Sequence, residues 1–93
     1  MAACSPWTYA GITPGAFQSL REYGRQRGFA VPDAPSGSFI IQTAGVKVTF
    51  RYDWNKTSGT LRLECTAKPQ LVSCSLIKSM ANRIVEQCGG KPV

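Results

Sequence analysis

The stretch that decides the fold spans residues 46–67 and reads VKVTFRYDWNKTSGTLRLECTA. Apolar and polar residues alternate without a break from Val46 to Trp54, and they alternate again from Leu61 to Ala67. Because successive side chains of a strand point to opposite faces, this period of two predicts two half-buried antiparallel strands. The residues between them include Asn, Ser and Gly, which are typical of a turn. The stretch therefore predicts a β-hairpin with one apolar face.

A shorter apolar segment precedes this hairpin. Residues 38–43 read SFIIQT and predict another strand, with Phe39 and Ile41 on the apolar face and Ile40 on the opposite face. The three strands together predict an antiparallel meander over residues 38–67. Any Tyr or Trp buried on its apolar face needs a hydrogen-bond partner for its polar atom.

A first helix is predicted over residues 13–28, before the strands. Thr13 is a good N-cap, Pro14 suits the first helical position, and Gly28 is a typical end. The apolar residues of this segment recur at helical spacing, which predicts one buried side. They are Ala16, Phe17, Leu20, Tyr23 and Gly24.

A second helix is predicted over residues 73–88, after the strands. Ser73 can cap its start, and Gly89 and Gly90 stop it. Its apolar residues form one continuous stripe. They are Leu76, Ile77, Met80, Ala81, Ile84, Val85 and Cys88.

These elements predict an α+β fold in two layers, with the order α-β-β-β-α. The two helices pack on the apolar face of the three-stranded meander, and the other face is exposed. The chain has 93 residues, of which 43% are hydrophobic and 17% charged, and this favours one globular domain over residues 1–93. Residues 1–12 are expected to form an irregular lead-in.

The location of the protein is predicted from what its sequence lacks. No stretch approaches the roughly 18 apolar residues that would span a bilayer, and no signal segment is recognisable. We therefore expect a cytoplasmic protein without a membrane span. The alternative is an exported protein, because Ala2-Ala3-Cys4 resembles the end of a lipoprotein cleavage site.

Several kinds of catalytic chemistry are unsupported by the residues present. The chain has no histidine, no glycine-rich nucleotide loop and no closely spaced metal ligands. Asp53 and Glu64 could share a sheet face, but the basic residues around them favour cross-strand ion pairs over acid/base catalysis. We therefore expect no enzymatic activity and no cofactor.

The four cysteines are widely spaced, at positions 4, 65, 74 and 88. Cys65 and Cys88 fall on apolar faces, where free cysteine behaves as a small hydrophobic residue. Cys74 falls in the first turn of the second helix, where the helix dipole can lower a thiol pKa, so it is a candidate reactive thiol. In an exported protein disulfides are expected instead, and three pairings are open.

Three functions are compatible with these features. The first is a protein-interaction module, such as an inhibitor, an adaptor or a subunit of an assembly, or a self-associating chain. Trp7, Tyr9 and Phe29 lie outside the regular pattern and could anchor a partner, unless they cap the open ends of the core.

The second hypothesis is a nucleic-acid-binding module. The net charge of +6 is dispersed along the chain and favours contact with phosphates or acidic surfaces. Arg21, Arg25 and Arg27 on the first helix are the candidate contacts. The third hypothesis is a small carrier that holds an apolar ligand between the sheet and the helices.

Overall fold

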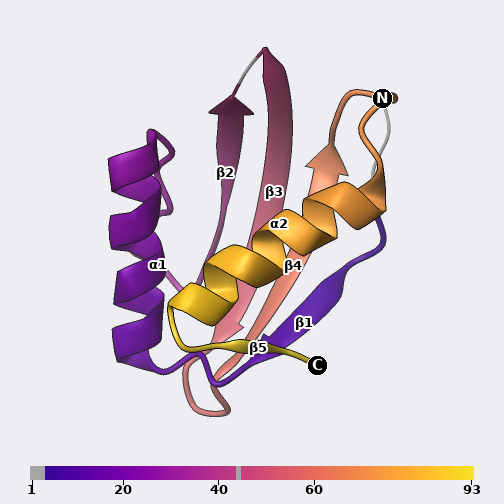
Figure 1. The fold of residues 1–93 in the computed structure, drawn as a ribbon. Coiled ribbons are helices and arrows are strands. Elements are labelled where there is room, and N and C mark those ends of the chain that lie inside the picture. The colour runs from indigo at the N-terminus through magenta and orange to yellow at the C-terminus, as the bar shows by residue number, and fades with distance from the viewer. Residues whose placement is uncertain (1–3, 44) are drawn as a thin grey trace.

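The predicted meander is part of a larger antiparallel sheet. Residues 4–43 and 45–93 are described in the computed structural model, which confirms the α+β class (Figure 1). The sheet has five strands in the order β2-β3-β4-β1-β5. Their bounds are Trp7–Ala10 for β1, Ser36–Thr43 for β2, Val46–Asn55 for β3, Thr60–Ala67 for β4 and Lys91–Pro92 for β5.

The prediction of an irregular lead-in over residues 1–12 is wrong for its second half. Residues 7–10 form β1, which pairs with β4 through Trp7 opposite Leu63 and Tyr9 opposite Leu61. Four residues are too few to show a clear alternation, and the partner strand lies more than fifty positions away in the sequence. Residues 1–3 lie outside the described part of the chain.

The register of the meander follows the predicted alternation. Phe50 lies opposite Phe39 on β2 and opposite Cys65 on β4, and all three side chains point to the helix side of the sheet. Phe50 is 1% exposed, whereas Ile40, predicted to face outward, is 45% exposed. The predicted inward and outward faces are therefore confirmed.

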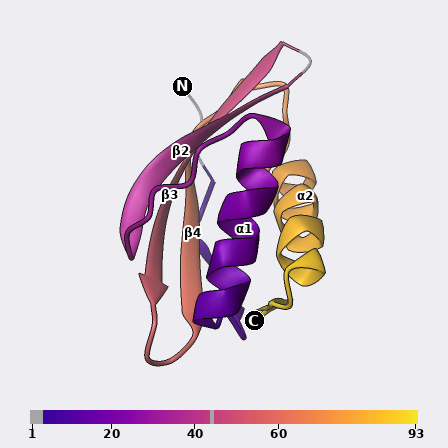
Figure 2. The same cartoon turned by 90° about the vertical axis from the view of Figure 1, so that its left-hand side faces the viewer.

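The two helices have the predicted caps and lie on one face of the sheet (Figure 2). Helix α1 spans Pro14–Arg27 and helix α2 spans Cys74–Gln87. The Thr13 hydroxyl accepts a hydrogen bond from the Ala16 N–H at 3.1 Å, and the Ser73 hydroxyl accepts one from the Leu76 N–H at 3.1 Å. None of the described helices is long and apolar enough to cross a membrane.

Aromatic residues fix α1 and the segment after it to the sheet. The ring of Phe17 stacks on the ring of Trp54 with a centroid separation of 4.2 Å. The Trp54 indole N–H donates to the Ile12 carbonyl at 2.8 Å, and the Tyr52 hydroxyl donates toward the Ala34 carbonyl at 2.7 Å. Buried Tyr52 and half-buried Trp54 thus both have hydrogen-bond partners for their polar atoms.

Candidate functional site: an apolar groove between the helices

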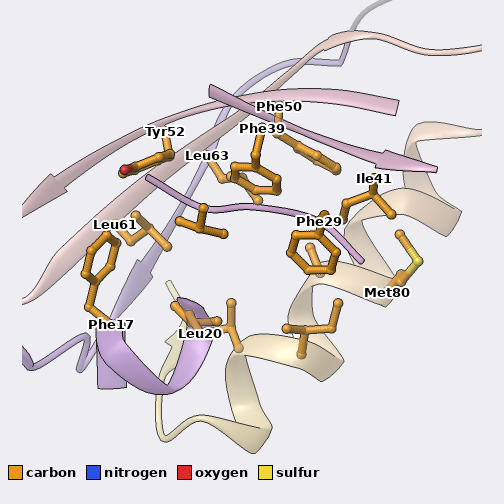
Figure 3. Close-up of a pocket in the computed structure, with 14 residues that line it drawn as sticks. Phe17, Leu20, Phe29, Phe39, Ile41, Phe50, Tyr52, Leu61, Leu63 and Met80 are labelled. Atoms are coloured by element: carbon orange, nitrogen blue, oxygen red, sulfur yellow. The ribbon is translucent and has the colours of Figure 1, made fainter. Parts of the chain in front are cut away.

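The two helices diverge across the sheet, and several apolar side chains between them are only half-buried. Helix α1 runs beside β2, whereas α2 crosses β3 and β4 diagonally, and the hairpin ends of β2 and β3 reach beyond α1 (Figures 1 and 2). A cavity of about 60 Å³ lies between the helices. It is lined by Phe17, Leu20, Phe29, Val31, Phe39, Ile41, Phe50, Tyr52, Leu61, Leu63, Met80, Ala81, Ile84 and Val85 (Figure 3).

Half-buried apolar side chains form the mouth of this cavity. Figure 3 shows Phe29, Ile41 and Met80 facing one another from the segment after α1, from β2 and from α2. Leu20 of α1 and Ile84 of α2 are also half-buried at this site. Four different parts of the chain therefore present apolar surface to the same opening.

The position of Phe29 depends on a glycine in α1. A Cβ atom at Gly24 would lie 2.7 Å from Cε2 of Phe29 and 2.8 Å from its carbonyl oxygen, which is closer than real Cβ contacts allow. The Phe29 N–H also donates to the Gly24 carbonyl at 2.9 Å. Glycine at position 24 thus lets Phe29 fold against the end of α1 and reach the ring of Phe39.

A second, shallower hollow of about 380 Å³ continues the first toward the hairpin end of the sheet. Its lining comprises Ile41, Val46, Val48, Val72, Leu76, Ile77, Ser79, Met80 and Arg83. Ile41 and Met80 belong to both hollows, so the two form one continuous surface, which we call the apolar groove.

One residue of the predicted α2 stripe behaves differently from the rest. Leu76 was expected to be buried, but it is 62% exposed, and that expectation is wrong. It lies in the first turn of α2, beside the half-buried Ile41 and Val46 at the hairpin end of the sheet. Leu76 therefore forms part of the rim of the apolar groove.

The three arginines predicted as a phosphate-binding set have different environments. Arg21 donates to the Val31 carbonyl at 3.2 Å and lies 3.8 Å from the Asp33 carboxylate, and Arg25 pairs with Glu22. Arg27 lies over the ring of Tyr23, at 4.8 Å from its centroid. The structure thus neutralises two of these charges locally, and nucleic-acid binding through them stays a prediction.

The three aromatic residues predicted as partner anchors are also separated. Tyr9 is 0% exposed; its hydroxyl donates to Asn82 Oδ1 at 2.7 Å and accepts from the Trp7 indole N–H at 2.7 Å. Burial raises the pKa of Tyr9 to about 12. Tyr9 is therefore a core residue, and its prediction as a surface anchor is wrong. Trp7 is half-buried on β1, away from the groove. Of the three predicted anchors, Phe29 is the one that lines the groove.

The prediction that Cys74 carries a reactive thiol is wrong. Cys74 forms a disulfide with Cys4, and the Cα–Cα distance between them is 5.7 Å. This bond joins the segment before β1 to the start of α2. Cys65 and Cys88 carry free thiols, and burial raises the pKa of each. A raised pKa keeps a thiol protonated and unreactive, which agrees with the packing role expected of these two residues.

The acidic residues of the sheet lie on its outer face. Asp53 pairs in register with Arg62, and Glu64 pairs in register with Arg51, so each acid lies directly opposite an arginine. Within residues 4–43 and 45–93, no group of three or more His, Cys, Asp or Glu residues could hold a metal ion. The register is the one that cross-strand ion pairs require, but the salt bridges found among the described residues join Arg21 to Asp33 and Arg25 to Glu22, so the ion pairs expected of Asp53 and Glu64 are not formed.

Sequence reasoning assigned most of the groove-lining residues to the core. Leu20, Ile41, Met80 and Ile84 are on the inward faces as predicted, but periodicity does not tell whether another element covers them. Comparisons with protein-family models, with curated proteins and with solved structures found no match. The function is therefore inferred from the groove itself.

Proposed function

We propose that this chain is a protein-interaction module that binds a partner protein in the apolar groove. The observation that carries this proposal is the exposure of apolar side chains from α1, β2, α2 and the segment after α1 around one opening. Apolar side chains that line an open groove are a common feature of sites that bind a partner's side chains. Met80 at the centre of the groove is flexible and polarizable, which suits contact with a partner side chain.

The shape of the groove favours a protein over an enclosed small ligand. Pockets that enclose a small molecule usually measure roughly 300 to 1,000 Å³. The inner hollow measures only about 60 Å³, and the larger hollow of about 380 Å³ lies at the hairpin end of the sheet beside exposed Leu76. Insertion of a few partner side chains suits this shape better than enclosure of a whole ligand.

The chemistry of the inner hollow supports a binding role without catalysis. Tyr52 is its one titratable lining residue, and burial raises the pKa of this hydroxyl. The hydroxyl also donates toward the Pro32 and Ala34 carbonyls, at 3.1 and 2.7 Å. It is therefore a poor proton donor or acceptor for a bound substrate.

The disulfide favours an oxidising compartment over the cytoplasm. Disulfides such as Cys4–Cys74 persist in exported proteins and are rare in reducing cytoplasm. We propose that the exported alternative is the correct one. Thiol titration of the denatured protein from its native source tests this: two free thiols per chain support export, and four contradict it.

The partner-binding role is tested with a variant that changes the groove and spares the fold. Leu76 is 62% exposed and lies in the first turn of α2, where a carboxylate interacts favourably with the helix dipole, so Leu76→Asp should fold normally. Ser75→Asp adds the same charge in the same turn but lies outside the groove, and it serves as the matched control.

The measurement is co-purification of tagged protein from the native source, followed by mass spectrometry and lipid extraction. The proposal predicts a protein that accompanies the wild type and Ser75→Asp in fixed stoichiometry and is lost from Leu76→Asp. Retention of the same proteins by Leu76→Asp, or recovery of a lipid alone, would reject a partner protein in the groove.

A further inference from the structure

We infer that the groove receives an amphipathic α-helix of the partner whose apolar side is flanked by acidic residues. This inference rests on the proposed function and adds the conformation and charge of the partner segment.

The helix layer covers the apolar side chains at the hairpin end of the sheet only in part, because Ile41 and Val46 are half-buried there. The floor of the shallower hollow is formed by Ile41, Val46 and Val48 at the hairpin ends of β2 and β3, beyond the reach of α1 (Figure 1). An α-helix with its side chains is about 10 to 12 Å wide and packs on a sheet as a second layer. A partner helix lying there would complete the layer that α1 and α2 begin.

The two hollows suit the spacing of side chains on one helix face. Helices that bind in grooves insert apolar residues from positions i, i+3 or i+4, and i+7. The inner hollow of about 60 Å³ has room for part of one side chain, and the outer hollow of about 380 Å³ has room for more. Ile41 and Met80 lie at the boundary between the inner and the outer hollow, so each hollow would receive a different side chain of the bound helix.

The segment after α1 covers the helix-side face of the first half of β2. Phe29 stacks on Phe39 with a centroid separation of 5.7 Å, and a Cβ atom at Gly37 would lie 3.1 Å from Cγ of Pro32. A helix that packs on the face of the sheet would therefore lie toward the hairpin end of β2, beyond this segment.

Two arginines provide the charge that selects an acidic partner. Arg83 of α2 lines the shallower hollow. Arg27 of α1 is two helical turns after Leu20, which lines the inner hollow, and its exposed guanidinium lies over the Tyr23 ring. Neither guanidinium takes part in an ion pair with another described residue, in contrast to Arg21 and Arg25. Carboxylates on both flanks of a bound helix could pair with them.

The inference is tested with a displayed library of helical peptides of about five turns. Apolar positions i, i+3, i+4 and i+7 vary among Leu, Ile, Phe and Met, and the flanking positions vary among Glu, Gln and Lys. Peptides that bind are selected in three separate experiments, with the wild type, with Arg27→Glu/Arg83→Glu and with Lys56→Glu/Lys91→Glu as the target. The last variant has the same net charge as the second, but its changes lie outside the groove.

We expect Glu to be enriched over Lys at the flanking positions by about tenfold or more, since an arginine attracts a carboxylate and repels an ammonium group. This preference should persist with the lysine double variant, vanish or reverse with the arginine double variant, and decrease in high salt. The selected peptides should lose affinity for Leu76→Asp and keep it for Ser75→Asp.

Other outcomes separate this inference from the proposed function. Equal enrichment of Glu, Gln and Lys, or the absence of any groove-dependent peptide, would overturn the inference that the groove binds a helix flanked by acidic residues. A Leu76-dependent partner found by co-purification would then still support a protein-binding groove. If palmitate binds the wild type, fails to bind Leu76→Asp and blocks peptide selection, an apolar ligand is the occupant and both proposals fail.

Discussion

Phe29 and Phe39 stack with their ring centroids 5.7 Å apart, and this contact joins the segment after α1 to the edge strand at the mouth of the groove. Phe39 stacks in turn on Phe50, which is fully buried in the centre of the sheet. The mouth of the groove is thus supported by the core through a row of three aromatic rings. Changes that move Phe29 should therefore alter both stability and partner binding.

Gly24→Ala tests this dependence. The new methyl group would lie under 3.0 Å from the ring and the carbonyl oxygen of Phe29, so Phe29 has to move. We expect a loss of about 1 to 3 kcal/mol in the free energy of unfolding, as is typical of overpacking, and weaker partner binding. Unfolding in urea measures the first effect.

Gly15→Ala is the control for this substitution. It lies in the same helix, but its Cβ would meet only the Thr13 hydroxyl, at 3.9 Å. It should stabilise the protein by about 0.5 to 1 kcal/mol, because alanine has the higher helix propensity. Equal effects of the two substitutions would show that Gly24 has no special packing role.

Loss of the disulfide should destabilise the protein strongly. Cys4 and Cys74 are separated by 70 positions, and closing a loop of this length restricts the unfolded chain. The double substitution Cys4→Ser/Cys74→Ser should lower the free energy of unfolding by about 4 kcal/mol. Cys88→Ser, at a half-buried free thiol, should have a much smaller effect. Urea unfolding of both variants with and without reductant provides the measurement, and no effect of reductant on the wild type would contradict a formed disulfide.

Stability should decrease at alkaline pH because of Tyr9. Its pKa is raised by burial from 10.0 to about 12, so the folded state holds the phenolic proton more tightly than the unfolded state does. The resulting stabilisation is fully present below pH 10 and is lost as the pH rises through the folded pKa. Over this interval the loss from Tyr9 is about 2 to 3 kcal/mol, at about 1.4 kcal/mol for each pH unit.

The comparison with Tyr9→Phe isolates this contribution. Tyr9→Phe removes the hydroxyl, so Asn82 loses its donor and the Trp7 indole loses its acceptor. We expect the variant to be less stable by about 1 to 3 kcal/mol at pH 8 and to have a shallower decline between pH 10 and 12. Parallel curves for the wild type and the variant would show that Tyr9 titrates normally.

The sequence predicts the elements whose signal is local. Alternation over residues 46–67 needs only neighbouring residues, and Thr13, Gly28 and Ser73 mark helix ends within one turn, so these predictions are confirmed. Strand β1 and the Cys4–Cys74 bond depend on partners far along the chain, which periodicity does not specify.

The groove is harder still to predict, because it depends on which inward-facing apolar residues of the sheet and helices are left partly exposed by the neighbouring elements. Ile41 and Val85 have the same inward position in their patterns, yet Val85 is covered and Ile41 is half-exposed. The difference arises from the angle at which α2 crosses the sheet, which depends on the packing of the whole chain. Phe29 was predicted either to anchor a partner or to cap the core, and it lines the groove, but its role as an anchor stays a prediction.

Site-specific photocrosslinking tests the central claim most directly. Met80, at the centre of the groove, is replaced by a photoreactive phenylalanine analogue, and Arg51, on the outer face of the sheet, is replaced in the same way as the control. Irradiation in the native source should join position 80, and not position 51, to one discrete partner protein. Adducts from position 51 alone, equal adducts from both positions, or the absence of a protein adduct at position 80 would contradict a partner bound in the apolar groove.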